Sequence, residues 1–328
     1  MTQGARSGGN VLGLSGGIGG AKLMQGLDRV LDRGVLRVVA NVGDDFTHLG
    51  LAICPDVDTL LYTLAGLADP VRGWGRRDET WTFMAALATL GAPTWFQLGD
   101  GDLALHVERT RRIADGESLS AITDAFRRQL AIESVVLPAT DDVVRTRVRT
   151  PDGWLSFQEY FVARRCEPLV EALAYDGAAT ARPCAAVLEA LADPSLRAVI
   201  IGPSNPLLSI EPMLAMPGLR DALRRCGVPI IAVSPIIAGA AVKGPTAKML
   251  RELDRPVDAL EAARRYADFI DGYVVDDSDQ ELVAAAPPGI HVIATNTLMP
   301  AMEAREQLAR ECLAFADALA GQVQVQVS

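Results

Sequence analysis

An apolar strand that runs directly into a polar loop constrains this chain more than any other feature. Residues 198–201 form a continuous apolar run, which is typical of a parallel strand covered on both faces, and Gly202 ends it. The loop that follows carries the short polar side chains of Ser204, Asn205 and Ser209 between prolines. In α/β proteins, ligands bind beyond the carboxyl ends of the strands, so we predict that this loop holds a ligand.

The bulk composition favours a globular protein and excludes several function classes. The chain has 328 residues, 49% of them hydrophobic, which is enough for a sizeable core in one large or two ordinary domains. Its formal net charge of −10 argues against a general nucleic-acid or membrane surface, because phosphate backbones and anionic lipids select basic patches. The five cysteines are scattered without a C-x-x-C pair, and the sequence has no signal pattern and no membrane span, so we expect a soluble cytoplasmic protein.

The order of predicted elements indicates an α/β fold. An apolar strand at 11–14 leads through a Gly-rich loop into a helix at 21–33, and a second strand follows at 36–42. This pattern is the opening βαβ unit of a doubly wound sheet. We therefore predict a Rossmann-like, doubly wound, mainly parallel sheet with an inserted smaller α/β subdomain.

The regular alternation is interrupted in the middle of the chain. Between 69 and 183, loops rich in Arg, Asp and Trp surround one predicted strand at 94–98 and a hairpin-like segment at 143–162. We assign residues 11–68 and 184–320 to the Rossmann-like core and residues 69–183 to an inserted cap or substrate subdomain.

A glycine-rich loop follows the first strand and opens the first helix. Residues 15–22 read Ser-Gly-Gly-Ile-Gly-Gly-Ala-Lys, and bare amides at a helix N-terminus can cradle phosphate. The loop is not a Walker A motif and departs from G-x-G-x-x-G, and its glycines would equally serve a tight turn and close helix packing. Together with the later polar loop, it gives the predicted phosphate- and nucleotide-binding residues Ser15, Gly16, Gly17, Gly19, Gly20, Ser204, Asn205 and Ser209.

A single lysine lies in an otherwise apolar stretch after another predicted strand. Residues 232–245 are mostly small or apolar around Lys243. An unpaired lysine is costly to bury, so Lys243 either reaches solvent or meets an anion, and we count it among the phosphate-binding candidates.

Carboxylates follow two of the predicted strands. Asp44 and Asp45 end the second strand, and Asp276 follows a strand late in the chain. With Asp56, Asp58, Asp100 and Asp102 they supply oxygen ligands suited to magnesium, and with only three histidines a histidine metal site is not expected. We predict catalytic roles for Asp45, Asp44 and Asp276, with Mg²⁺ held by Asp45 and Asp276. The other interpretation makes them solvated turn formers and makes Asp58 a helix cap.

Eight short blocks, taken in order, resemble the 2-phospho-L-lactate transferase family, and the likeness runs from Val11 to about Leu319. The Pro-Ser-Asn-Pro and Ser-Pro-Ile-Ile segments are more specific than the glycine loop. The blocks lie at 14–22, 41–45, 55–59, 95–100, 157–161, 202–206, 233–239 and 242–245.

The resemblance implies a reaction, a metal and a homodimer. The family moves a phosphorylated three-carbon acid, 2-phospholactate or phosphoenolpyruvate, from a guanosine diphosphate conjugate to the hydroxyl of the deazaflavin Fo. This reaction gives a precursor of coenzyme F420 and GMP, and it requires Mg²⁺.

The same blocks suggest roles for individual residues. Asp45, with Asp44 or Asp276, would hold the metal or orient the hydroxyl, and the amides of Gly16–Gly20 and Lys243 would hold phosphates. The substrate-binding candidates are Asn41, Asp58, Asp100 and Ser234. Ile18 stands where the family usually has Thr, which removes one hydroxyl but leaves the backbone amides in place.

Two other functions remain open from the sequence. A non-enzymatic UDP-sugar-binding regulator of the gluconeogenesis-factor type would use the same glycine loop and core, although that group lacks the Pro-Ser-Asn-Pro and Val-Lys-Gly-Pro blocks. An NAD-dependent oxidoreductase would rest on the first βαβ unit alone.

Overall fold

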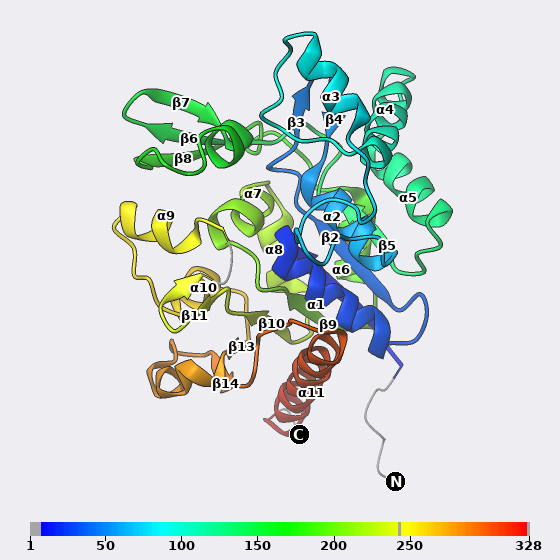
Figure 1. Cartoon of the computed structure of the whole chain (residues 1–328). Coiled ribbons are helices and arrows are strands. Elements are labelled where there is room, and N and C mark those ends of the chain that lie inside the picture. Colours follow the sequence, from blue (N-terminus) through cyan, green and yellow to red (C-terminus); the bar gives the residue numbers. More distant parts are fainter. Residues whose placement is uncertain (1–7, 242–243, 327–328) are drawn as a thin grey trace.

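A seven-stranded parallel sheet forms the centre of the protein in the computed structural model, which describes residues 8–241 and 244–326 (Figure 1). The strand order is β14-β13-β10-β9-β1-β2-β5, which is the 3-2-1-4-5-6 order of a Rossmann sheet with a seventh strand added. The strands are β1 (Asn10–Ser15), β2 (Leu36–Ala40), β5 (Val135–Pro138), β9 (Leu196–Ile201), β10 (Ile230–Val233), β13 (Gly272–Val275) and β14 (His291–Ala294).

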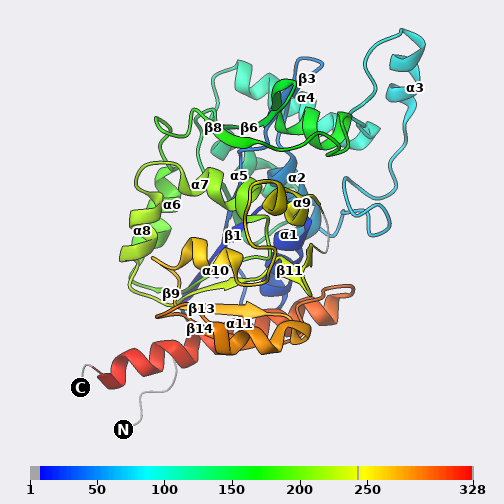
Figure 2. The ribbon, with the colours of Figure 1, turned by 90° about the vertical axis from the view of Figure 1, so that its left-hand side faces the viewer.

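Helices cover both faces of this sheet. On one face α1 (Gly17–Val30) packs between α2 (Pro55–Leu64) and α11 (Met302–Gln326), whereas α6 (Ala185–Ala192) and α8 (Leu219–Arg225) lie on the other (Figure 2). Strands covered on both faces are apolar throughout, as β10 is, with all its residues buried. The predicted doubly wound α/β class is confirmed.

The remaining helices range from four to fifteen residues. The helices are α3 (Thr82–Thr89), α4 (Asp100–Ala114), α5 (Leu119–Gln129), α7 (Glu211–Leu214), α9 (Thr246–Glu252) and α10 (Glu261–Tyr266), with π- or 3₁₀-turns η1 (Glu159–Ala163), η2 (Pro206–Ile210) and η3 (Asp277–Ala285). Within the described residues, no helix combines the length and the apolarity needed to cross a bilayer.

A small antiparallel sheet stands beside the carboxyl edge of the main sheet (Figure 1). It has the order β7-β6-β8 and consists of β6 (Arg145–Thr150), β7 (Gly153–Ser156) and β8 (Ala172–Asp176). A second apolar cluster, which includes Val148, Tyr160, Leu207 and Met249, packs this sheet against η2 and α9. Two hairpins complete the fold: β3 (Phe46–His48) with β4 (Leu51–Ile53), and β11 (Ile236–Ile237) with β12 (Ala240–Ala241).

The middle of the chain differs from the sequence prediction in two respects. Residues 94–98 form no strand, because Trp95 and Phe96 pack into an aromatic cluster with Phe46. The third strand of the main sheet is β5, which lies within 69–183 but pairs with β2. The segment therefore contributes to the main sheet as well as to the small one, and the predicted hairpin at 143–162 is present as β6 and β7.

The main sheet reverses its order between β1 and β9, and two glycines let the loops after these strands touch. A Cβ atom on Gly202 would lie 2.8 Å from the Cα of Gly20. A Cβ atom on Gly20 would lie 2.5 Å from the hydroxyl oxygens of Ser15 and Ser204. This reversal is the place where open α/β sheets bind ligands.

We expect Gly202→Ala to lower the free energy of unfolding by about 1–3 kcal/mol, because the added methyl group would overlap backbone atoms that cannot move aside. Gly321→Ala is the matched control, since Gly321 faces open space in α11, and it should be neutral or stabilise by up to about 1 kcal/mol. Urea unfolding at equilibrium measures both changes. Wild-type stability in Gly202→Ala would contradict the close approach.

Candidate active site

Polar side chains tie together the loops that follow β1, β2 and β9. The amide of Gly16 donates to the Ser204 hydroxyl at 3.1 Å, and the amide of Gly17 donates to the Asp56 carboxylate at 2.5 Å. The Asn41 side chain donates to the other Asp56 oxygen at 2.9 Å. The Asp56 carboxylate therefore lies at the N-terminus of α1, where an anion is stabilised. That the amides of Gly16 and Gly17 bind phosphate stays a prediction.

The two predicted asparagines hold the backbone of these loops. Asn41 accepts from the amide of Gly43 at 2.9 Å and donates to the carbonyl of Leu208 at 3.2 Å. Asn205 accepts from the amides of Leu207 and Leu208, at 2.9 and 3.2 Å, and so caps η2. Both residues lie in the predicted region and position the chain around it.

The three predicted serines gather around the glycine loop. Ser204 accepts from Gly16, and the Ser209 hydroxyl would lie 2.8 Å from a Cβ atom on Gly16. The Ser15 hydroxyl is fully buried and has no hydrogen-bond partner within 8–241 and 244–326. The structure thus brings the glycine loop and the polar loop after β9 together, as predicted.

Asp44 and Asp45 are buried in the loop after β2. They are 7% and 5% exposed, and the Oδ1 atom of each has no hydrogen-bond partner in the described part of the chain. Burial raises the pKa of Asp45 to about 7, against the opposing effects of the Arg145 guanidinium and a hydrogen bond from the Cys54 thiol. Burial, with repulsion from Asp56 and Asp45, raises the pKa of Asp44 well above its usual range. Each carboxylate would therefore gain from a proton or a cation.

A cavity of about 340 Å³ opens beside these two carboxylates. The β6–β7 hairpin, distant in sequence, forms its other side, and this hairpin brings Arg145 and Arg147 to the site. The Gln158 amide donates to the carbonyl of Asp44 at 3.3 Å. The lining residues are Gly43, Asp44, Asp45, Phe46, Val143, Arg145, Thr146, Arg147, Ser156, Phe157, Gln158, Asp176 and Gly177.

Sequence reasoning missed the arginines on this wall. The signal that could have found them is the alternation of arginine with threonine and valine along 145–150, which places the arginines on one face of a strand.

Aromatic rings pack together at the Phe46 side of the cavity. Phe46 lies 4.8 Å from Phe96, and His48 lies 5.0 Å from Trp95, between ring centroids. Phe46 lines the cavity, and the edge-to-face packing of the other rings supports it from behind.

Asp276 lies apart from Asp45. Its strand, β13, is four positions from β2 in the sheet, roughly 19 Å at a strand spacing of about 4.8 Å. Its carboxylate accepts from the amide and hydroxyl of Thr297, at 2.9 and 3.0 Å, and from Ser278. Although burial opposes ionisation, these hydrogen bonds hold the pKa of Asp276 below its usual range. The predicted joint metal site of Asp45 and Asp276 is not formed.

Two of the predicted substrate-binding residues serve local structure. The Ser234 hydroxyl lies within hydrogen-bond distance of the carbonyls of Ile236 and Ala259, at 2.9 and 3.1 Å. Asp100 accepts from the Thr80 hydroxyl at 2.6 Å, which lowers its pKa to about 2, and from the first amides of α3. Asp100 is thus a cap for the start of α3.

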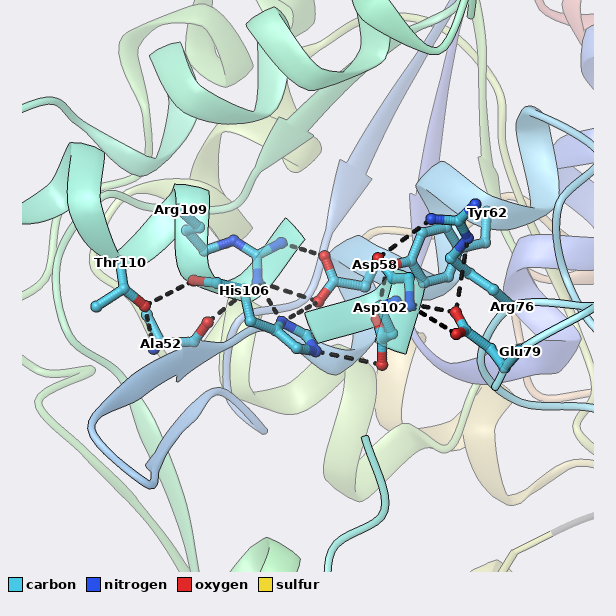
Figure 3. A network of polar contacts seen from close by, with 10 residues as sticks. Ala52, Asp58, Tyr62, Arg76, Glu79, Asp102, His106, Arg109 and Thr110 are labelled. Atoms are coloured by element: carbon cyan, nitrogen blue, oxygen red, sulfur yellow. Dashed lines mark hydrogen bonds and ion pairs between the residues drawn. The ribbon is translucent and has the colours of Figure 1, made fainter. Parts of the chain in front are cut away.

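Asp58 is neutralised inside the protein (Figure 3). Its carboxylate pairs with both terminal nitrogens of Arg109, one of them at 3.1 Å, and the Arg109 side chain is 1% exposed. His106 bridges Asp58 and Asp102 at 3.6 and 3.3 Å, and Tyr62 donates to Asp102 at 2.5 Å. The network joins α2 to α4, so the structure places Asp58 in a structural ion pair. The alternative role of Asp58, as the cap of a helix that begins at Thr59, is wrong because the helix begins at Pro55.

Lys243, a predicted phosphate-binding residue, lies outside the described residues.

Within 8–241 and 244–326, no three histidine, cysteine or acidic side chains converge as a ready metal site. The free oxygens of Asp44 and Asp45 nevertheless fit a hard cation that takes its remaining ligands from water and substrate, as magnesium does.

Comparisons with known proteins agree on one family. The profile of the family described as 2-phospho-L-lactate transferase CofD matches residues 11–298. A phosphoenolpyruvate transferase from Kitasatospora aureofaciens is 40% identical, over 94% of this chain and 98% of its own length. A 2-phospho-L-lactate transferase from Methanocaldococcus jannaschii is 35% identical, over 93% of this chain and 98% of its own.

A solved structure supports the fold. A member of the UPF0052 family from Bacillus halodurans superposes with a TM-score of 0.58 and 14% identity, over 93% of this chain and 99% of its own. At this identity the likeness bears on the fold and not on the function.

The raised pKa of Asp45 predicts a pH-dependent stability. Asp45 holds its proton more tightly in the folded protein than in the unfolded chain, so its stabilising contribution is present below about pH 4 and is lost as the pH rises through about 7. Without divalent metal, we expect this loss to be roughly 2–4 kcal/mol. In Asp45→Asn the free energy of unfolding should fall less steeply as the pH rises, as measured by urea unfolding from pH 4 to 8. The exposed Asp115→Asn is the control, and an unchanged slope in Asp45→Asn would contradict the assignment.

The buried ion pair predicts a large cost for Arg109→Leu, about 3–5 kcal/mol, because the buried Asp58 carboxylate would lose its arginine partner. Arg111→Leu is the matched control on the same helix. Its pairs with Glu108 and Asp115 are exposed, so its loss should cost less than about 1 kcal/mol. Thermal and urea unfolding measure both, and equal losses would argue against the structural role of Asp58.

Proposed function

Because the chain belongs to the 2-phospho-L-lactate transferase CofD family, we propose that it acts in the biosynthesis of the deazaflavin coenzyme F420. It is an enzyme that transfers a phospho-acid group. The reaction that we propose moves a phosphorylated three-carbon acid from a guanosine diphosphate conjugate to the hydroxyl of Fo and releases GMP.

The acid that we propose first is phosphoenolpyruvate, with 2-phospholactate as the second candidate. The relative at 40% identity is named a phosphoenolpyruvate transferase, and the one named a 2-phospho-L-lactate transferase is 35% identical. The two acids differ only at the carbons next to the carboxylate, so a few side chains decide between them.

The observation that carries the proposal is the pair of buried carboxylates with free oxygens on the wall of the cavity. Asp44 and Asp45 face a second wall that carries Arg145 and Arg147. A site with both signs of charge suits a reaction whose main demand is to align a pyrophosphate and neutralise its charge.

In the proposed reaction the Fo hydroxyl oxygen attacks the phosphorus that bears the three-carbon acid. A new P–O bond forms, the P–O bond to GMP breaks, and GMP leaves with the bridging oxygen. The hydroxyl proton passes to a carboxylate, and we propose the free oxygen of Asp45 on the cavity wall as its acceptor. Mg²⁺ bound by Asp44 and Asp45 would stabilise negative charge on the phosphates.

The nucleotide and the ring of Fo are assigned to regions near Asp44 and Asp45. We assign the nucleotide end to the reversal of the sheet, where Ser15, Ser204 and Ser209 surround the glycine loop. We assign the planar ring of Fo to the aromatic cluster that includes Phe46 and Trp95. A cytoplasmic homodimer is also part of the proposal, and all five cysteines are free thiols, as a reducing compartment favours.

A transfer assay tests the function. Purified protein is incubated with Mg²⁺, Fo and separate enolpyruvyl, lactyl or glyceryl guanosine diphosphate donors, and GMP and the fluorescent product are measured. We expect product from the enolpyruvyl donor, and a loss of at least about 100-fold in kcat for Asp45→Asn. Asp115→Asn, on the exposed end of α4, should keep wild-type turnover.

No product from any donor, together with binding of UDP-sugars, would reject the transferase in favour of a regulator. Full turnover by Asp45→Asn would reject the role of Asp45 while leaving the transferase in place.

A further inference from the structure

A row of arginines runs along β6. The strand reads Arg-Thr-Arg-Val-Arg-Thr from 145 to 150, and Thr146, Val148 and Thr150 are buried at 0–2% exposure. Side chains alternate between the faces of a strand, so Arg145, Arg147 and Arg149 share the opposite face. The alternation gives β6 one buried face and one cationic face.

The start of this row is fastened to the acidic loop. The amide of Thr146 donates to the carbonyl of Gly43 at 2.6 Å, immediately before Asp44 in the chain. Arg145 and Arg147 therefore line the cavity, whereas Arg149, two residues further along the same face, does not. Arg149 instead lies over the Trp154 ring, 5.8 Å from its centroid.

The two cavity arginines use few of their donors inside the protein. Arg145 donates to the carbonyl of Val144 at 2.7 Å. Arg147 donates to the carbonyl of Leu155 at 3.3 Å and lies 3.5 Å from Asp176, in a pair whose side chains are 37% and 58% exposed. A guanidinium carries five N–H donors, and a long, exposed ion pair contributes little, so both side chains retain donors for a ligand.

The hydroxyl of Thr146 is a further buried polar atom, on the other face of the strand. Its side chain is 2% exposed and lines the same cavity, and its Oγ1 has no hydrogen-bond partner among the described residues. A buried hydroxyl without a partner is costly, so a polar group bound in the cavity between β6 and Gly43 would stabilise it.

We propose that Arg145 and Arg147 form a carboxylate-binding subsite that holds the acid group of the transferred three-carbon unit. The inference deepens the proposed function and rests on it. The donor carries two kinds of anion: the phosphates, which we assign to the glycine loop and to a Mg²⁺ that Asp44 and Asp45 would hold, and one carboxylate, which needs a cationic partner of its own. The planar fork of arginine matches a carboxylate with two parallel hydrogen bonds.

In this assignment the two arginines recognise the carboxylate that all the candidate acids share, and other residues distinguish one acid from another. Lactyl, enolpyruvyl and glyceryl units all carry the carboxylate, so the arginines would bind what the three acids share. GMP and simple alkyl phosphates lack it and would not depend on the arginines.

Calorimetric binding of two probes tests the subsite in the presence of Mg²⁺. Phosphoenolpyruvate carries the carboxylate and ethyl phosphate does not. We expect Arg147→Gln to weaken phosphoenolpyruvate binding by about 10- to 100-fold and ethyl phosphate binding by less than about threefold. Arg149→Gln, the matched control on the same strand face, should change neither, and Arg145→Lys should weaken phosphoenolpyruvate binding while keeping the charge.

Three outcomes would overturn the subsite: equal losses for both probes in Arg147→Gln, equal effects of Arg147→Gln and Arg149→Gln, or a wild-type protein that binds phosphoenolpyruvate no better than ethyl phosphate. Circular dichroism and thermal unfolding establish that the variants are folded.

Turnover with the full donor and Fo is measured in parallel. Arginine-dependent binding without turnover would support the subsite and reject the transfer to Fo, so the two proposals fail separately.

Discussion

Two buried carboxylates with free oxygens are the constraint around which the rest of the site is arranged. Asn41 and the hydrogen bond from Thr146 to Gly43 fix the loop that carries Asp44 and Asp45, so these side chains cannot turn out to solvent without losing well-placed contacts. Burial of ionisable groups without full pairing costs stability, and a cation, a proton or a ligand relieves that cost. The fold thus maintains a pair of acidic groups that a proton or a bound cation stabilises.

Asp58 shows the opposite arrangement one turn into α2. Arg109 pairs with its carboxylate from 51 residues away, and His106 and Asp102 extend the network to Tyr62 (Figure 3). The ion pair at Asp58 joins α2 to α4. Asp44 and Asp45 are incompletely paired, so each keeps an oxygen atom that can bind a metal ion or accept a proton. The site also joins two cores, since the main sheet supplies the acids and the glycine loop, and the small sheet supplies the arginines.

Local pattern was enough to predict the sheet and the loops that meet at its reversal. The apolar runs at 11–14 and 198–201 become adjacent parallel strands, and the glycine and serine loops after them are in contact. The sequence did not predict β5 because its apolar run is short and lies in an irregular region. It predicted a strand at 94–98 because aromatic residues are common in strands, whereas here they pack into a cluster of rings. Partners distant in sequence could not be predicted: Arg109 for Asp58, Arg145 beside Asp45, and Thr297 for Asp276.

The central claim is that Asp44 and Asp45 form the metal and reaction centre of a phospho-acid transferase. Anomalous diffraction from crystals grown with Mn²⁺, a stand-in for Mg²⁺, and GMP tests it most directly. The claim predicts an anomalous peak from a Mn²⁺ ion that is bound by the carboxylates of Asp44 and Asp45. A peak bound by Asp276 or Asp58, with Asp44 and Asp45 free of metal, would contradict it.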